Sequence, residues 1–248
     1  MESTHGTPVD WNELQLEQKL GEGASGVIHR ATWRQGEASE QVAVKLFKGA
    51  ITSDGSPLCE MAACISAGAH PNLIPILGQL EQHPDDTHGL VMALISPEFR
   101  NLAGPPSLDS CTRDIYAAGK RFDLATVRAI AHGIASAASQ LHQRGIMHGD
   151  LYGHNILHCE QGRCLLGDFG AASFYDPAGP HAAELQQLEV RAFGFLLEEL
   201  MERCDSPLPQ QLIALQAACA HTDSAARPLF AQIAQQLEAL DNLLDNSI

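Results

Sequence analysis

The apolar pattern of this 248-residue chain changes from a strand type to a helix type, and this change constrains the fold most strongly. Before residue 96, short β-branched or alternating apolar runs are separated by glycine-bearing loops, which predicts strands. A helix is also predicted in this part, because Ser56 and Pro57 are typical of a helix start, and it should end near Ala67. The predicted strands cover residues 14–20, 26–33, 41–47, 73–80 and 90–95.

Helical patterns dominate after residue 121. An Ala-rich helix is predicted over residues 123–144, with Asp123 as its N-cap and Gly145 at its end. Residues 96–121 carry Pro, Gly and Ser with weak periodicity and are interpreted as a linker plus an insertion. A strand-rich first part and a helical second part predict an α+β protein with two lobes and a ligand cleft. Further helices are predicted over residues 183–203, 209–220 and 228–244.

The charge balance is strongly acidic, with 15 Lys and Arg against 30 Asp and Glu, a formal net charge of −15. Such a surface repels nucleic-acid phosphates and anionic lipids, so neither nucleic acid nor a membrane is expected as a partner. No apolar run reaches the roughly 18–20 residues that a membrane-spanning helix needs. The first six residues lack the basic start and apolar core of a signal peptide. A cytoplasmic location is therefore expected.

Seven cysteines are scattered along the chain without a C-x-x-C pair or an ordered histidine spacing. This pattern does not predict a structural zinc site, and it is typical of reduced thiols in a cytosol-like compartment. The cysteines are Cys59, Cys64, Cys111, Cys159, Cys164, Cys204 and Cys219.

Residues that suit nucleotide phosphates lie in the strand-rich part. Residues 21–26 read G-E-G-A-S-G between two predicted strands, and glycines permit backbone N–H groups to approach phosphate oxygens closely. No helix follows these glycines, which argues against dinucleotide binding. On the next strand, Lys45 ends the run V-A-V-K, and Glu60 on the predicted helix is its natural ion-pair partner.

Two loops in the helical part carry residues suited to metal and proton chemistry. Residues 148–155 read H-G-D-L-Y-G-H-N, so Asp150 and Asn155 lie five positions apart in one loop. Asp150 can orient an acceptor hydroxyl, while the amide oxygen of Asn155 can bind a metal ion. Asp168, in the run D-F-G, provides a carboxylate that suits Mg²⁺ between β- and γ-phosphates.

Taken in order, these motifs resemble the protein-kinase signature, and the resemblance extends over about residues 14–240. It implies a two-lobed protein-kinase-like fold of the α+β class within a single domain, residues 1–248. The N-lobe, residues 1–95, would hold an antiparallel sheet plus one helix. The C-lobe, residues 96–248, would be mainly helical, with an insertion around residues 97–121. Further matches are the runs His70-Pro71-Asn72, Phe193-Gly194 and Arg227-Pro228.

The resemblance also implies ATP and Mg²⁺ as ligands and a role for each motif residue. The catalytic residues would be Asp150, which orients the nucleophile, Asn155, and Lys45 held by Glu60. Asn155 and Asp168 would bind magnesium. Residues that contact the nucleotide would be Gly21, Glu22, Gly23 and Gly26 at the phosphates, Lys45 at the α/β-phosphates, Val27 and Ala43 against adenine, Met92 as the gatekeeper, and the backbone of Ala93 and Ile95 at the adenine edge.

Three departures from the signature concern the acceptor side. Gly149 stands where many kinases carry an Arg that pairs with an activation-loop phosphate, which predicts activity without such phosphorylation. Tyr152 replaces the usual Lys; His154 could supply a donor there or be a packed loop histidine. Only residues 171–187 separate D-F-G from the helix that carries Phe193, and no A-P-E run is present. The chain resembles minimal kinases of bacterial or effector type, which act in a cytosol, including that of a host.

The favoured hypothesis is an ATP- and magnesium-dependent protein kinase that phosphorylates Ser or Thr of a protein substrate. One alternative is a small-molecule phosphotransferase that resembles aminoglycoside or choline kinases, which a charged pocket built by residues 96–121 would favour. Another is an ATP-binding pseudokinase that serves as a scaffold. The complete set of motif residues argues against this third hypothesis.

Overall fold

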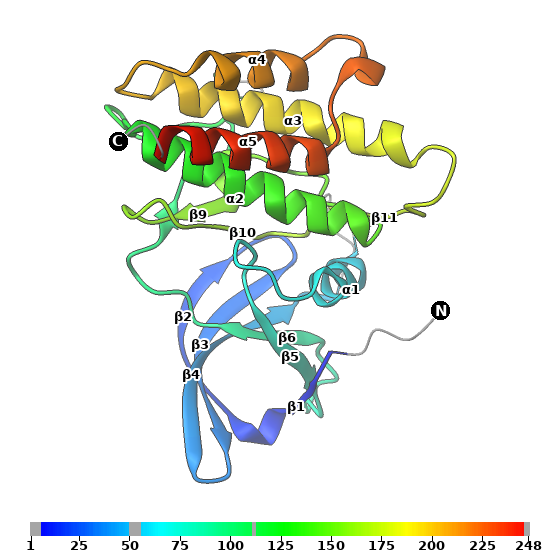
Figure 1. Cartoon of the computed structure of the whole chain (residues 1–248). Coiled ribbons are helices and arrows are strands. Elements are labelled where there is room, and N and C mark those ends of the chain that lie inside the picture. The colour runs from blue at the N-terminus through cyan, green and yellow to red at the C-terminus, as the bar shows by residue number, and fades with distance from the viewer. Residues whose placement is uncertain (1–5, 50–55, 111–112, 246–248) are drawn as a thin grey trace. The chain divides into compact units, whose positions relative to one another are not determined.

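A computed structural model describes residues 6–49, 56–110 and 113–245 of the chain (Figure 1). The chain divides into two compact units, each of which is described by itself. The first unit contains residues 1–70, 74–96 and 168–173, and the second contains residues 71–73, 97–167 and 174–248.

The first unit is built on a six-stranded sheet with the order β1-β5-β6-β4-β3-β2. β1 pairs in parallel with β5, and the other neighbours are antiparallel. Val9, Val42 and Val91 are fully buried together on this sheet, because β-branched side chains pack well on a pleated surface. The strands are β1 (Pro8–Asp10), β2 (Leu14–Glu22), β3 (Gly26–Gln35), β4 (Ala38–Phe47), β5 (Ile76–Glu81) and β6 (Gly89–Ala93).

One helix, α1 (Pro57–Ala67), packs on this sheet. Ser56 is its N-cap, and Pro57 occupies its first turn, as the sequence predicts. Met61 of α1 forms an apolar cluster with Phe47 and Leu90 of the sheet. This packing fixes the helix face that also carries Glu60.

The second unit is mainly helical. In Figure 1, α5 (Phe230–Asp245) runs beside α2 (Leu124–Gln143), and α4 (Gln210–Cys219) runs beside α3 (Ala182–Glu202). Asp123 caps α2 by accepting a bond from the Thr126 N–H at 2.7 Å, and Gly145 follows with φ +68°. Together with the antiparallel-rich sheet of the first unit, these helices confirm the predicted α+β class.

Short elements complete the second unit. β7 (Arg100–Asn101), β9 (Ile156–His158) and β10 (Cys164–Leu166) form a three-stranded sheet in the order β10-β9-β7. β8 (Ile146–Met147) pairs with β11 (Ser173–Phe174), of which only Phe174 belongs to this unit. Single 3-10 turns cover Trp11–Glu13 in the first unit and Gly153–Asn155 and Ser224–Ala226 in the second.

The predicted strand over residues 73–80 was wrong at its start. β5 begins only at Ile76, because Leu73 belongs to the second unit, where it bridges Leu166, and Pro75 has no N–H to donate to a sheet. The strand predicted over residues 90–95 likewise ends at Ala93.

In the segment 97–121, the described residues 97–110 and 113–121 are irregular apart from the two residues of β7. Two backbone bonds between Gly104 and Ile115, of 2.8 and 2.9 Å, close the loop. Cys111 lies outside the described residues, and the six described cysteines are free thiols. In the described part of the chain, none of the helices has the length and apolarity needed to cross a membrane.

Candidate active site

The glycine-rich turn joins β2 to β3 in the first unit. The Gly23 N–H donates to the Gly26 oxygen at 2.9 Å and closes the turn. A Cβ at Gly26 would lie 2.6 Å from the Leu46 oxygen, so β3 and β4 can approach this closely only with glycine there. At Gly21 and Gly23 a Cβ would meet no atom within 4 Å, which leaves open space beside the turn.

The side chain of Glu22 is exposed and belongs to a surface ion-pair cluster. It pairs with Lys19, and its Oε1 accepts a bond from Lys48 Nζ at 2.6 Å. Hydrogen bonds from Lys19 and Lys48, together with their charges, lower the pKa of Glu22 to about 2. The Glu22 carboxylate is thus already paired with two lysines of the chain.

Lys45 of β4 and Glu60 of α1 form an ion pair, as the sequence predicts. The Lys45 side chain is 13% exposed and that of Glu60 is 3% exposed, so this pair differs from an ordinary surface pair. The second carboxylate oxygen of Glu60 is buried without a partner among the described groups. The Lys45 ammonium also lies 5.2 Å from the centre of the Phe47 ring, which restricts its position further.

Asp168 lies in the same unit as this pair. Its φ is +54°, an unfavourable value for a non-glycine residue, and its Oδ1 accepts a bond from the Gly170 N–H at 3.2 Å. Burial and the charges of Glu60 and Asp168 raise the pKa of the Cys64 thiol to about 12, against the opposing effect of Lys45. The pKa of the Cys64 thiol therefore depends on the charges of all three predicted ATP- and metal-binding residues of this unit. The Asp168 side chain itself is exposed.

Four of the residues predicted to contact adenine lie on three adjacent strands, and the fifth, Ile95, follows the end of β6. Ala43 is buried on β4 and pairs with Met92 of β6, and Val27 lies on β3. The Ala93 N–H donates to the Pro75 oxygen at 3.0 Å, so it is not available to a ligand. No such bond engages the Ile95 N–H among the described backbone contacts.

Asp150 and Asn155 lie together in the second unit. The Asn155 amide nitrogen donates to Asp150 Oδ2 at 2.7 Å and to the Asp150 backbone oxygen at 2.9 Å. This leaves the Asn155 amide oxygen, a ligand type that Mg²⁺ accepts, without a bonded donor in the described part of the chain.

His154 connects Asp150 to a residue that the sequence does not single out. His154 Nε2 lies 3.2 Å from Asp150 Oδ2, and Nδ1 lies 2.8 Å from Asp114 Oδ1. Asp114 is buried and also accepts a bond from the His154 N–H at 2.9 Å. Bonds to Asp114 and then Asp150 raise the pKa of His154 to about 10, so an imidazolium stands beside Asp150 at neutral pH. Both ring nitrogens of His154 thus contact carboxylates of the chain itself, as expected of a packed loop histidine, and a role as donor to a phosphate stays a prediction.

Replacing Asp114 by Asn is expected to lower the pKa of His154 well below 10, because a neutral amide no longer stabilises the imidazolium. NMR titration of the His154 ring measures this change. In the native protein, protonated His154 stabilises the folded state because its pKa is raised on folding. This contribution to the unfolding free energy is complete below the ordinary histidine pKa of ~6.5 and is lost as the pH rises toward about 10. The stability gap between native protein and Asp114→Asn should thus narrow at high pH. Asp109→Asn, an exposed change in the same loop, should leave the His154 titration unchanged.

Glu189 of α3 holds the backbone of the loop that carries Asp150. Its carboxylate accepts bonds from the Gly149 N–H at 2.7 Å and the His148 N–H at 3.2 Å, and it lies 2.8 Å from His142 Nε2. Burial alone would raise the pKa of Glu189, but its bonds with His142 and Gly149 contribute to a value below the ordinary one. Gly149 adopts φ +81°, a conformation that favours glycine over the Arg found here in many kinases.

Two hollows of the second unit involve residues 97–121. Arg113 lines one of about 480 Å³ beside Tyr152. The other, of about 270 Å³, carries both signs of charge and includes none of residues 150–155; its lining residues are Glu98, Arg100, Lys120, His158, Cys159, Glu160 and Gln161.

The predicted site residues thus form two groups. Lys45, Glu60 and Asp168 come together in the first unit, and Asp150 and Asn155 come together in the second. Asp114 was missed, because a lone acidic residue in a loop without periodicity gives no signal of its long-range partner.

Comparison with known proteins gives the family. Residues 14–191 match the model described as protein tyrosine and serine/threonine kinase. A probable serine/threonine-protein kinase, gdt4, from Dictyostelium discoideum is 32% identical over 63% of this chain and 8% of its own length. The serine/threonine-protein kinase mos of Gallus gallus is 27% identical over 66% of this chain and 48% of its own length. A putative cyclin-dependent kinase F-2 from rice, Oryza sativa, is 30% identical over 61% of this chain and 45% of its own length.

The chain spans less than half the length of these relatives. The family match covers well over half of the chain itself and includes each group of predicted site residues. The chain therefore belongs to the protein tyrosine and serine/threonine kinase family.

Proposed function

We propose that this chain is an ATP- and magnesium-dependent protein kinase that transfers the γ-phosphoryl group to Ser or Thr of a protein. The observation that carries the proposal is the arrangement at Asp150, whose carboxylate is bonded by His154 and Asn155 next to a backbone held by Glu189. Relatives named as serine/threonine kinases support the choice of acceptor. The proposed lobes are residues 1–95 and 96–248, and the proposed location is the cytoplasm, in keeping with the free thiols.

On the donor side, the buried Lys45–Glu60 pair is suited to hold α/β-phosphate oxygens. The backbone of Gly21, Glu22, Gly23 and Gly26 would cover the phosphates, and the open space beside Gly21 and Gly23 suits that role. Adenine would pack on Val27 and Ala43 beside Met92. Because the Ala93 N–H is already bonded, Ala93 would accept with its carbonyl and Ile95 would donate its N–H.

The donor set fits magnesium. Asp168 offers an exposed carboxylate in a left-handed backbone conformation, and Asn155 offers an amide oxygen without a bonded donor. Mg²⁺ is commonly held by one or two protein oxygens together with phosphates and water, so each of these oxygens is of a kind that the ion accepts. When bound, the ion neutralises charge that develops on the phosphates.

The reaction would proceed as a displacement. The acceptor oxygen forms a bond to the γ-phosphorus, the bond to the oxygen that bridges the β- and γ-phosphorus breaks, and ADP leaves with that oxygen. Asp150 accepts the hydroxyl proton. A hydrogen bond from His154 lowers the pKa of Asp150, and a bond from Asn155 adds to this effect, although burial of the carboxyl opposes it. The Asp150 carboxylate is therefore ionised at neutral pH. Such a carboxylate orients the hydroxyl and takes its proton late, as a loose transition state permits.

The small-molecule alternative predicts an acceptor pocket at Asp150. The smaller hollow is charged and includes Glu98, Arg100 and Lys120, but it contains no residue of the loop 150–155. The larger hollow touches that loop at Tyr152 and runs along a helix, which suits an extended protein segment better than a compact alcohol. These observations favour a protein acceptor.

Transfer of radiolabelled phosphate from ATP tests the function. The native chain should label itself or a generic protein substrate, and mass spectrometry should find the label on Ser or Thr. Labelling of an aminoglycoside or choline with no labelled protein would favour the small-molecule phosphotransferase. Absence of transfer to any acceptor would favour the scaffold, and thermal stabilisation by ATP with Mg²⁺ would then show whether that scaffold binds the nucleotide.

Replacing Lys45 by Met should lower the transfer rate about 10²- to 10³-fold, since a preorganised charge at the phosphates is lost. Steady-state kinetics measure this loss. Lys120→Met, which removes a lysine outside both groups of site residues, serves as the control and should retain the native rate. An unchanged rate in Lys45→Met would contradict the proposed role of the ion pair.

A further inference from the structure

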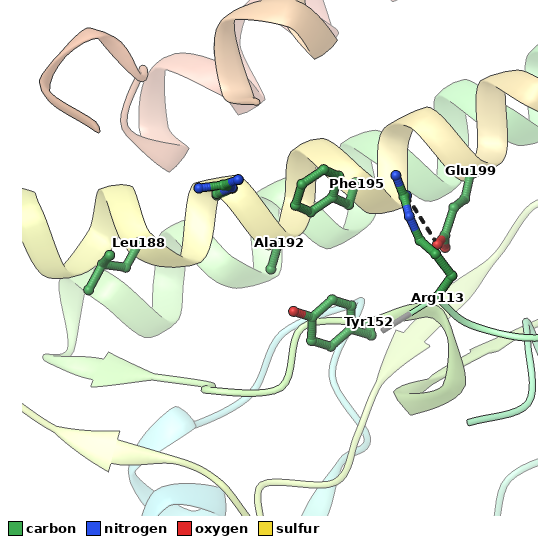
Figure 2. Close-up of a pocket in the computed structure, with 7 residues that line it drawn as sticks. Arg113, Tyr152, Leu188, Ala192, Phe195 and Glu199 are labelled. Atoms are coloured by element: carbon green, nitrogen blue, oxygen red, sulfur yellow. Dashed lines mark hydrogen bonds and ion pairs between the residues drawn. The ribbon is translucent and has the colours of Figure 1, made fainter. Parts of the chain in front are cut away.

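One face of α3 is open along several turns. Leu188, Ala192, Phe195 and Glu199 recur every three or four residues, so they lie on one side of the helix, together with Arg191. Leu188 is 58% exposed, so its apolar side chain is accessible to a partner. Figure 2 shows these side chains in a row along α3, with Tyr152 and Arg113 reaching toward them from loops of the same unit. These seven residues line a hollow of about 480 Å³, termed the α3 groove.

The groove offers one positive charge that is not already paired. Arg113 is bound by Glu198 at 2.6 Å and Glu199 at 3.4 Å, so its charge is balanced within the chain. Arg191 lies over the Phe195 ring at 5.6 Å, and no described carboxylate comes within ion-pair distance of it. In a chain of net charge −15, an unpaired arginine in a hollow is a local attraction for an anion.

The groove is connected to the proposed catalytic carboxylate by two side-chain contacts. The Tyr152 ring stacks on the His154 ring, with centroids 6.1 Å apart and planes at 9°. His154 Nε2 in turn lies 3.2 Å from Asp150 Oδ2. An extended segment covers about 10 Å in three residues, so a substrate with its hydroxyl at Asp150 reaches the groove within a few residues.

We propose that the α3 groove binds an acidic side chain of the protein substrate, a few residues from the phosphorylated Ser or Thr. The proposal rests on the proposed kinase function and adds a substrate class to it. The carboxylate would pair with Arg191, while its aliphatic part would contact Leu188 and Phe195. A single unpaired guanidinium beside apolar side chains suits Asp or Glu of the substrate. The substrate carboxylate neutralises the charge of Arg191, and the methylene groups of the substrate side chain are removed from water by the apolar side chains of the groove.

Peptides with one Ser acceptor test this proposal. Glu is placed in turn at each position from five before to five after the Ser, and each peptide is compared with its Gln and Lys counterparts. The native chain should show a position at which Lys in place of Glu lowers kcat/KM about tenfold, since attraction is replaced by like-charge repulsion. Arg191→Glu should reverse this preference. Arg100→Glu makes the same charge change on exposed β7, outside the groove, and should retain it.

The outcomes separate the groove from the kinase function. The groove proposal would be overturned if the native chain is active but shows no charge preference, or if Arg191→Glu keeps the native preference. Either result would leave the proposed kinase function unaffected. If no peptide is phosphorylated, the proposed function fails; fluorescence anisotropy without ATP then shows whether the Glu peptides still bind through Arg191. Should thermal unfolding show that Arg191→Glu is misfolded, Arg191→Gln replaces it and should abolish the preference without reversing it.

Discussion

Replacing Asp150 by Asn is expected to lower phosphoryl transfer about 10³-fold while ATP binding persists. The amide of Asn cannot accept the proton of the acceptor hydroxyl, and positioned proton acceptors contribute roughly 10²- to 10⁴-fold to rate. The substitution keeps the size of the side chain, so the bonds to His154 and Asn155 need only modest adjustment. Single-turnover kinetics with radiolabelled ATP measure the chemical step directly.

A matched control for this loss is Asp176→Asn, an exposed aspartate in the turn before α3. It should retain the native rate. Thermal stabilisation by ATP with Mg²⁺ shows whether the nucleotide still binds to Asp150→Asn. A transfer rate within a few-fold of native for Asp150→Asn would show that this carboxylate does not act on the acceptor.

The second large effect is expected on stability. Glu189→Ala removes a buried carboxylate and leaves the N–H groups of His148 and Gly149 without their acceptor. Breaking a buried interaction from one side costs about 3–5 kcal/mol of unfolding free energy, a large share of the 5–15 kcal/mol typical of a domain. Urea unfolding followed by circular dichroism measures the loss.

Glu184→Ala provides the comparison, because Glu184 is exposed on the same helix. Its effect should be within about 0.5 kcal/mol. If the two variants unfold at the same urea concentration, Glu189 does not hold the loop. Transfer activity of Glu189→Ala should also fall below 10% of native at temperatures where the protein is folded, because the backbone that bears Asp150 loses its support.

The helices could be predicted closely from the sequence because their ends carry local signals. Ser56 with Pro57 marks the start of α1, and Asp123 with Gly145 brackets α2, so both are predicted within a residue or two. α3, α4 and α5 also lie within two residues of their predicted starts. The two-residue strands and β1 were missed, because such short segments carry no periodicity and depend on partners distant in sequence.

The site was predictable where its residues belong to motifs that occur in a known order, and it was not predictable where a residue lies outside those motifs. The Lys45–Glu60 pair and the Asp150–Asn155 contact were expected from motif order, and the structure contains both. The bond between Asp114 and His154 joins residues 40 positions apart in the chain, and Asp114 lies next to Ile115, whose backbone pairs with Gly104. The ligand roles of all these residues stay predictions.

α3 carries both Glu189, which holds the backbone of the loop that contains Asp150, and the residues that line the α3 groove. Glu189 and Phe195 are six residues apart on one uninterrupted helix, which corresponds to about 9 Å along its axis at 1.5 Å per residue. A rigid helix keeps such a spacing constant, whereas a long activation segment can shift. The distance from the phosphorylated residue to its acidic neighbour would then be fixed by the helix itself, so that inserting a single residue between them would rotate the groove by about 100° away from the loop.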